Sequence, residues 1–296
     1  MDEAIQTWSP TRRDMLFQKG SSFGIQHSTL IEMLADYHTH TPLCHHATGL
    51  PIEYARVARE RGLAEIGISD HNPMPSRFDD WRMDIDDFDA YLDMVEVARV
   101  ELAPFPVRLG LECDFIPGKE NWIEDLAGRN SWDYLIGSVH YIAPGWDVDN
   151  PKWIGRFSER PVAEIWELYF DAYEKCISSG LFDFVAHPDL VKKFGHRPKG
   201  DLRSFYEPSI AAAAKNGTII EVSTAGLRKP AGEIYPAREF LEMAQEAGVG
   251  IVISSDAHAP EEVGLDFDRA LSLVKDVGFT QSFRFCRRTK TSFPLP

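Results

Sequence analysis

Four of the ten histidines lie within nine residues near the start of the chain, at His38, His40, His45 and His46. In an extended segment side chains alternate between two faces, so His38 and His40 point the same way and could hold one metal ion. His46 follows a turn at Pro42 and can return towards a neighbouring ion. A solvated loop is the alternative interpretation, but the apolar run Met33-Leu34-Ala35 is typical of a buried strand that ends in ligands. Imidazole is the commonest neutral metal ligand at neutral pH, which favours a metal site.

Further potential ligands end or follow short apolar runs along the whole chain. With the first pair, these side chains are His38, His40, His71, Glu112, His140, His187, Asp256 and His258. Taken singly, each has an ordinary explanation: Glu112 could pair with an arginine, and His187 could be a satisfied core histidine. Chance would scatter histidines over helices and loops. Their shared placement after apolar runs therefore indicates one common site.

The types of these residues indicate which ions they would bind and what chemistry would follow. Imidazoles with a few carboxylates and no thiolate suit zinc, manganese or iron, and one glutamate can bridge two ions. Two or three such ions can hold the oxygens of a phosphoryl group and acidify a bridging water. The sequence therefore predicts metal-assisted hydrolysis. We find no P-loop, Gly-x-Ser-x-Gly motif or dinucleotide fingerprint that would indicate another chemistry.

The elements that must position these residues alternate between strand and helix patterns. The predicted strands cover residues 34–38, 65–69, 107–112, 134–139, 182–186, 218–222 and 250–254. The predicted helices cover residues 51–61, 88–102, 122–127, 162–178, 202–215, 237–246 and 267–275. This alternation implies a parallel sheet, and seven such units close most naturally into a TIM-like barrel of the α/β class. All the predicted ligands then lie at the carboxyl ends of strands, where barrel enzymes have their active sites.

The length of 296 residues fits one barrel domain, which we expect over residues 33–296. Residues 1–32 lack a sustained hydrophobic period, so we expect them to be an N-terminal extension. The stretch 143–159 is predicted to be a long loop over the active site.

Charge and hydrophobicity exclude several classes of partner. The net charge of -15 argues against a nucleic-acid binder, which needs a basic face to neutralise phosphates. No apolar run reaches the roughly 18 residues of a membrane span, and no signal peptide is evident, so we expect a cytoplasmic protein. One basic cluster near the end of the chain is interpreted as a solvated tail in preference to an anion-binding patch: Arg284, Arg287, Arg288 and Lys290.

At the predicted ligands the sequence resembles the PHP (polymerase and histidinol phosphatase) family. The resemblance rests on His38-x-His40, Ser69-Asp70-His71, Glu112, Ser138-Val139-His140, His187-Pro188 and Asp256-Ala257-His258, and spans about residues 34–275. Within the family, the stretches from His187 to Phe194 and from Thr224 to Lys229 are similar to those of monofunctional histidinol-phosphate phosphatases.

The resemblance implies a distorted seven-stranded (β/α) barrel that carries three divalent or trivalent metal ions, zinc, manganese or iron. It assigns the first ion to His38, His40, Glu112 and Asp256. It assigns the second ion to Glu112, His140 and His187, and the third to His46, His71 and His258. The spacing within the family selects His46 over His45, while His27 and His196 match no ligand position. Glu112 and Asp256 are therefore expected to be catalytic through the ions they hold.

The organic part of the substrate has fewer candidate contacts. A phosphate dianion needs further cations, and five lie on predicted loops near the open face: Lys192, Lys193, Arg197, Arg228 and Lys229. We expect at most two of them to touch substrate, with Lys193 and Arg228 the first choices as catalytic residues. Family members can carry arginine at the position of Lys193. A lysine keeps the positive charge but cannot make the bidentate contact of an arginine. Two carboxylates, Asp114 and Asp189, could meet a substrate amine or protonate the leaving group.

Three aromatic residues could form a wall for an imidazole ring, or could simply pack in the core or anchor a loop: Tyr141, Trp146 and Trp153.

The expected reaction is hydrolysis of L-histidinol phosphate to L-histidinol and phosphate, in histidine biosynthesis. Two alternatives stay open at this point. A PHP phosphoesterase could act on nucleotides or nucleic-acid ends, although the acidic composition argues against it. A barrel could also bind metals without catalysis. No pattern in the sequence predicts the oligomeric state.

Overall fold

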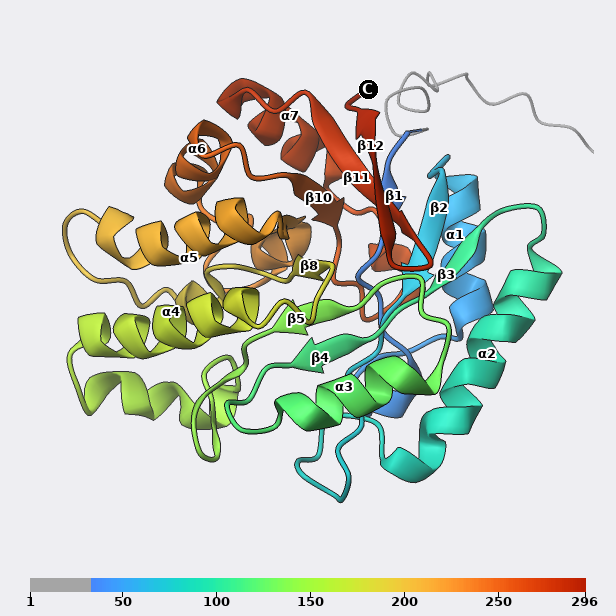
Figure 1. The fold of residues 1–296 in the computed structure, drawn as a ribbon, viewed down its shortest axis with the longest axis horizontal. Helices are drawn as coiled ribbons and strands as arrows, with labels where there is room; N and C mark the ends of the chain where they lie inside the picture. Colours follow the sequence, from blue (N-terminus) through green and yellow to red (C-terminus); the bar gives the residue numbers. More distant parts are fainter. Residues whose placement is uncertain (1–32) are drawn as a thin grey trace, which may run out of the picture.

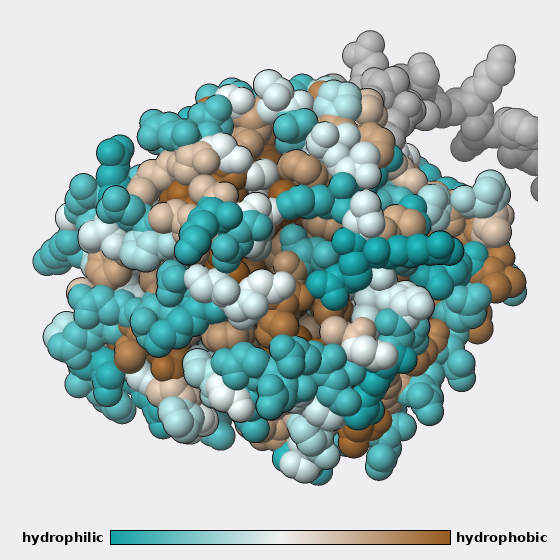
Figure 2. All heavy atoms as spheres, in the orientation of Figure 1, coloured by the Kyte–Doolittle hydropathy of each residue, from teal (hydrophilic) through white to brown (hydrophobic). Residues whose placement is uncertain are grey.

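The computed structural model describes residues 33–296 (Figure 1). The predicted extension 1–32, with His27, lies outside the described residues. The fold is mixed α/β, with two parallel sheets surrounded by helices. No helix in residues 33–296 is both long enough and apolar enough to cross a membrane. The surface seen in Figure 2 is largely hydrophilic, with hydrophobic residues visible mainly between the polar ones.

The predicted strands all occur, and most of them are shorter than the apolar runs that predicted them. The first sheet has the order β1-β2-β3, formed by Ala35–Asp36, Glu65–Ile68 and Val107–Leu109. The second has the order β10-β9-β8-β5-β4, formed by Ile251–Ser254, Ile219–Ser223, Phe184–Val185, Ile136–Ser138 and Glu112–Asp114. Every pairing within these two sheets is parallel, as the alternation of strands and helices predicted.

The run predicted as one strand over residues 107–112 is divided into β3 and β4, and each part belongs to a different sheet. Close packing around Tyr134 accompanies the division, since a Cβ on Gly110 would lie 2.2 Å from that ring and a Cβ on Gly67 would lie 2.1 Å from its hydroxyl. The Tyr134 hydroxyl donates to the Tyr37 carbonyl at 2.6 Å. Both glycines therefore make room for an aromatic ring between the strands.

Hydrogen bonds join the two sheets at both of their edges. On one side, the Glu112 amide donates to the Asp70 carbonyl at 3.0 Å, next to an isolated parallel bridge between His71 and Glu112. On the other side, the Ala257 amide donates to the His38 carbonyl at 3.0 Å, and the His40 amide donates to the Ala257 carbonyl at 2.9 Å. The segments that follow β1 and β10 are thus held side by side.

The α-helices of residues 33–296 pack outside the strands and bury their apolar faces against them (Figure 1). They are α1 Pro51–Glu60, α2 Phe88–Glu101, α3 Glu120–Arg129, α4 Val162–Ser178, α5 Arg203–Asn216, α6 Arg238–Glu246 and α7 Phe267–Val277. Short 3-10 helices follow several strands: η1 Pro42–Cys44, η2 Ile85–Asp87, η3 Pro151–Ser158, η4 Leu190–Lys192, η5 Thr224–Arg228 and η6 Pro260–Glu262. These 3-10 segments shape the loops around the site.

The prediction of a tail at the end of the chain is wrong, although Arg287, Arg288 and Lys290 of the basic cluster are exposed as expected. Residues Gln281–Cys286 and Thr289–Pro294 form an antiparallel hairpin, β11 and β12. The basic residues within it had led to the prediction of a solvated tail. Phe285 is 1% exposed, and its ring lies 5.3 Å from that of Phe184 and 5.4 Å from that of Tyr37. The burial of this one aromatic ring holds the hairpin on the strands. Arg288 pairs with Asp183, so part of the cluster fastens the hairpin.

The predicted long loop carries a second small hairpin, β6 Tyr141–Ala143 with β7 Trp146–Asp147, followed by η3. Asp147, Asp149, Asn150 and Pro151 of this segment line the cavity described next. The loop therefore does lie beside the predicted site.

Candidate metal centre

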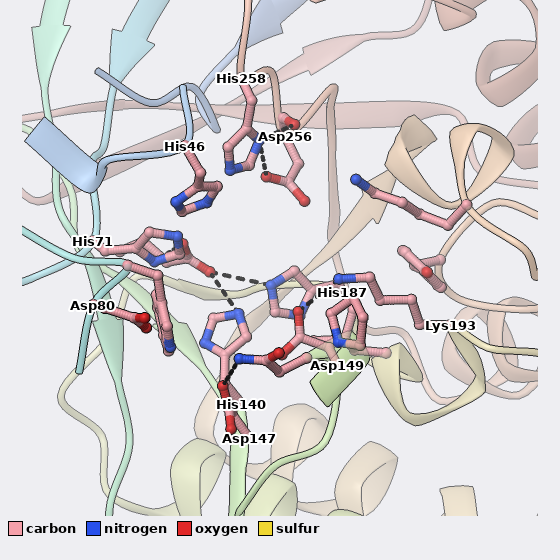
Figure 3. Close-up of a pocket in the computed structure, with 17 residues that line it drawn as sticks. His46, His71, Asp80, His140, Asp147, Asp149, His187, Lys193, Asp256 and His258 are labelled. Atoms are coloured by element: carbon pink, nitrogen blue, oxygen red, sulfur yellow. Dashed lines mark hydrogen bonds and ion pairs between the residues drawn. The ribbon is translucent and has the colours of Figure 1, made fainter. Parts of the chain in front are cut away.

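The predicted ligands converge at the carboxyl ends of the strands, around a cavity of about 450 Å³. The cavity wall includes His46, His71, Glu112, His140, His187, Asp256 and His258 (Figure 3). His38 and His40 lie beneath it and are fully buried. Side chains that are more than 200 residues apart in the sequence thus meet in one place, as their positions after strands predicted.

Glu112 stands at the centre of this group. Its Oε2 lies 2.8 Å from Nδ1 of His71 and 3.2 Å from Nε2 of His38. Its Oε1 lies 3.1 Å from Nε2 of His187 and 3.8 Å from Nε2 of His140. One buried carboxylate therefore faces imidazoles on both of its oxygens, which is the arrangement needed to bridge two cations.

Asp256 completes the first predicted group of ligands. Its Oδ1 lies 3.1 Å from Nε2 of His40 and 3.7 Å from Nε2 of His38. His40 Nε2 is also 3.7 Å from Oε2 of Glu112. Four candidate donor atoms from four side chains thus surround one small space, as expected for one metal position.

The third predicted group gathers around His258. The ring centroids of His46 and His258 are 4.7 Å apart, and those of His46 and His71 are 5.5 Å apart. His258 also belongs to two sets of side chains spaced for a cation, one with His40 and His71 and one with Cys44 and His46. His46 lines the cavity and its rival His45 does not, which agrees with the choice made from the family spacing.

Buried donor atoms without a hydrogen-bond partner test whether these residues suit metal ions. His38 Nε2, His71 Nδ1 and Glu112 Oε2 are all buried and unpartnered, and they face one another. Leaving such atoms unsatisfied is costly, so their clustering is best explained by a cation between them. The set of imidazole and carboxylate donors suits zinc, manganese or iron. The residues present therefore fit the metal centre that the sequence predicted.

Electrostatics keep the central carboxylate negative. Burial acts to raise the pKa of Glu112, but the surrounding His38, His71 and His187 outweigh burial and hold that pKa well below its usual value. Burial likewise acts to lower the pKa of His140, yet the neighbouring Asp114 raises it to about 10. In the absence of cations this ring is therefore protonated, and metal binding must displace its proton.

Hydrogen bonds to the Nδ1 atoms set the direction of several rings. His140 Nδ1 lies 2.7 Å from Asp114 Oδ1, and His46 Nδ1 lies 2.7 Å from the Cys44 carbonyl oxygen. His40 Nδ1 lies 3.5 Å from Asp70 Oδ1. Such partners fix the tautomer and leave Nε2 to face a metal ion.

Asp114 therefore lies behind His140, with its second oxygen 2.7 Å from Arg82. This position does not support the expected contact of Asp114 with substrate. Asp189 is similarly occupied, because Oδ2 pairs with Lys192 at 2.7 Å. Neither carboxylate lines the cavity.

Only two of the five predicted phosphate-binding cations line the cavity, Lys193 and Lys229. Lys193 Nζ lies 2.8 Å from Asp149 Oδ2 (Figure 3). This pairing keeps the ammonium at the cavity wall.

The remaining three cations have other partners, so their positions do not support the expected contacts with substrate. Lys192 is fully buried and binds Asp189, and Arg197 pairs with Glu233. Arg228 donates to the Ser255 carbonyl at 2.8 Å and pairs with Glu262 at 3.2 Å. The local path of η4 and η5 decides which cations face the cavity, and no pattern in the sequence indicates that path.

The aromatic wall also differs from the expectation. Trp81 and Tyr235 line the cavity, whereas Tyr141, Trp146 and Trp153 do not. The Trp81 ring lies 4.7 Å from that of His71, at a steep angle. Asp80, Asp147, Asp149 and Asn150 are further wall residues that the sequence analysis missed. Three of them lie on loops and Asp147 ends the short strand β7, none within a motif, so only their nearness to a predicted loop or strand end could have marked them.

The fold and the site together define an α/β protein with a buried cluster of imidazoles and carboxylates at the carboxyl ends of parallel strands. The model of the PHP domain matches residues 36–225, and the chain belongs to that family.

Named relatives cover nearly the same length. The probable histidinol-phosphatase of Deinococcus radiodurans is 42% identical over 247 residues, which is 83% of this chain and 94% of that protein. The histidinol-phosphatase of Bacillus subtilis is 27% identical and covers 80% of this chain and 97% of its own. A crystal structure of histidinol phosphate phosphatase from Lactococcus lactis, complexed with zinc, L-histidinol and phosphate, is similar with a TM-score of 0.72 at 19% identity. It covers 87% of this chain and 98% of that chain.

Proposed function

We propose that the protein is a metal-dependent phosphatase that hydrolyses L-histidinol phosphate to L-histidinol and phosphate, in histidine biosynthesis. The observation that carries the proposal is the position of Glu112, whose two oxygens face imidazoles from different strands. The name of the D. radiodurans relative, at 42% identity over nearly its full length, supports the substrate. The zinc, L-histidinol and phosphate in the L. lactis structure support both the metal and the reaction.

Nine residues would hold three ions, each zinc, manganese or iron. We assign His38, His40, Glu112 and Asp256 to the first ion, and Glu112, His140 and His187 to the second. His46, His71 and His258 would hold the third. When bound, such ions polarise phosphoryl oxygens and acidify the water that attacks phosphorus.

The chain's own residues bind and orient the substrate. Lys193 and Lys229, the two cavity-lining lysines, are placed to receive the phosphate dianion. Asp149 holds the Lys193 ammonium at 2.8 Å, so less side-chain freedom is lost when phosphate binds. Trp81 and Tyr235 offer apolar surface for the imidazole ring of the substrate.

We further propose that the two sheets are parts of one distorted seven-stranded barrel, with β3 and β4 as halves of one strand. The hydrogen bonds between His38, His40 and Ala257, and the bridge between His71 and Glu112, support this architecture. A single domain over residues 33–296 is part of the same proposal. The cytoplasmic location expected from the sequence stays a prediction.

The test is turnover by protein purified without chelator and supplied with zinc or manganese. Histidinol phosphate should be hydrolysed much faster than nucleoside monophosphates, cyclic diesters or a generic aryl phosphate. Equal rates on all of them would defeat the narrow substrate and leave a broad phosphoesterase. Elemental analysis of the same sample identifies the metals.

Replacing Glu112 with Gln tests the centre itself. The amide keeps the shape but supplies only one acceptor oxygen, so metal content and turnover should fall together. The exposed Glu124→Gln is the matched control. A fully active Glu112→Gln variant that holds the full complement of metal would contradict the assignment.

A further inference from the structure

Glu221 lies in β9 and contacts His38 of the first predicted ligand group and His187 of the second. It matches none of the site residues predicted from the sequence. It is fully buried. Three donors converge on its two oxygens. His38 Nδ1 lies 2.7 Å from Oε1, and the Ser254 hydroxyl donates to the same oxygen. The backbone amide of His187 donates to Oε2 at 2.7 Å.

The contact with His38 determines which nitrogen of that ring can bind a cation. A carboxylate oxygen only accepts, so Nδ1 of His38 must carry a hydrogen, and Nε2 is the nitrogen that can offer its lone pair to a cation. Nε2 is the atom that lies 3.2 Å from Glu112 Oε2 and 3.7 Å from Asp256 Oδ1. Glu221 thus turns the lone pair of His38 towards the first group of ligands.

The contact with His187 acts through the backbone. His187 has a φ of 26°, a conformation that residues other than glycine rarely adopt. Its amide is held by Glu221 Oε2, and its Nε2 lies 3.1 Å from Glu112 Oε1. His38 and His187 therefore face opposite oxygens of Glu112, and both are fixed from behind by one side chain.

We propose that Glu221 is a positioning residue that couples the first and second metal positions by fixing the His38 tautomer and the His187 backbone together. The inference rests on the metal centre of the proposed function, but not on the identity of the substrate. Outer partners of this kind commonly change metal affinity by roughly 10- to 100-fold when they are replaced.

A glutamine at position 221 cannot satisfy all three donors, because its amide has one acceptor oxygen and one NH₂ group. The His187 amide cannot change its role, so the oxygen should stay with it. The NH₂ group then faces His38 Nδ1, and the ring can accept that hydrogen bond only by moving its own hydrogen to Nε2. In that tautomer His38 cannot bind a metal ion.

The experiment measures the tautomer and metal binding directly. In the zinc-loaded wild type, ¹⁵N NMR of the histidine rings should show His38 with its hydrogen on Nδ1 and no hydrogen on Nε2. In Glu221→Gln the hydrogen should move to Nε2, and affinity for one of the three ions should fall roughly 10- to 100-fold. Zinc titration and elemental analysis give the number of ions and their affinities.

Glu65→Gln is the control, since Glu65 is a buried strand carboxylate that binds Tyr37 and Arg108 away from the site. It should lose stability without changing the number of ions. Unchanged metal affinity in a folded Glu221→Gln protein would overturn the inference. If that variant does not fold, the spectrum of the zinc-loaded wild type decides, because a hydrogen on Nε2 of His38 in that state refutes the tautomer. Wild-type protein that binds zinc but does not hydrolyse histidinol phosphate would defeat the proposed substrate alone.

Discussion

Replacing Arg82 with Met is the sharpest test of how the site is supported. The side chain is 3% exposed, and its guanidinium lies 2.7 Å from Asp79 and 2.7 Å from Asp114. It also lies 4.4 Å from the centre of the Trp81 ring. Asp114 in turn orients His140, so this cation stands behind one of the predicted metal ligands.

The expected cost follows from what the variant leaves behind. Burial acts to raise the pKa of Asp114, but His140 and Arg82 outweigh it and hold that pKa below its usual value. Without Arg82 the buried carboxylate loses one of its two charged partners. Removing one partner of a buried ion pair costs about 3–5 kcal/mol. That is a large fraction of the roughly 5–15 kcal/mol by which a typical domain is stable.

Urea unfolding at a fixed zinc concentration measures this cost. The control is Arg129→Met, which breaks an ion pair with Asp125 whose side chains are 40% and 50% exposed. Such pairs contribute at most about 1 kcal/mol. The double variant Arg82→Met/Asp114→Asn should lose less than the sum of the single losses, because the unpaired charge is gone. A loss below about 1 kcal/mol for Arg82→Met would refute the reasoning.

Three further predictions concern the cavity, the pH dependence and the hairpin. Lys193→Ala should raise KM for histidinol phosphate and lower kcat. Lys192→Ala should mainly destabilise the protein, by about 3–5 kcal/mol, because it leaves the buried Asp189 carboxylate without its cation. Steady-state kinetics and urea unfolding of both variants separate the two effects. Burial acts to raise the pKa of Asp149, but the charge of Lys193 outweighs burial and lowers that pKa from 3.8 to about 2. Because the folded pKa is the lower one, the pair stabilises the protein above about pH 4, by about 2 kcal/mol, and loses this as the pH falls towards 2. The difference in unfolding free energy between wild type and Asp149→Asn should therefore shrink over that range, and a difference that stays constant would contradict the assignment. Phe285→Ala should lower the free energy of unfolding by about 3–5 kcal/mol, measured by thermal or urea unfolding. A loss near zero would show that packing of the hairpin on the strands does not stabilise the protein.

Much of the fold could be predicted because the buried parallel strands are nearly continuous apolar runs. The break between β3 and β4 was not predictable from the sequence. Gly110 looks like an ordinary strand glycine, and only the structure shows that the Tyr134 ring packs against it. The C-terminal hairpin was missed for a related reason. Its exposed Arg and Lys residues dominate the local pattern, and the inward-facing Phe285 has its partners more than 100 residues away.

The convergence of the predicted ligands could be predicted, because a sequence pattern can locate strand ends and the carboxyl ends of parallel strands meet at one edge of a sheet. The residues around them are harder to predict. Lys192 and Lys193 are neighbours in sequence, yet the turn at η4 buries one and directs the other to the cavity. Glu221 reads as an unremarkable residue of a buried strand. Its role depends on donors that follow β1 and β8 or end β10, which only the folded chain brings together.

The wide separation of the proposed ligands along the chain has a consequence for how metal loading and folding are connected. Apart from His38 and His40, no two ligands of the first ion lie close together in the sequence. An unfolded chain therefore offers that ion only one pair of nearby ligands and binds it weakly. Cations that bind the native protein far more tightly than the unfolded one stabilise it by mass action. The melting temperature of this protein should therefore rise with free zinc, and chelation should make it more susceptible to proteases.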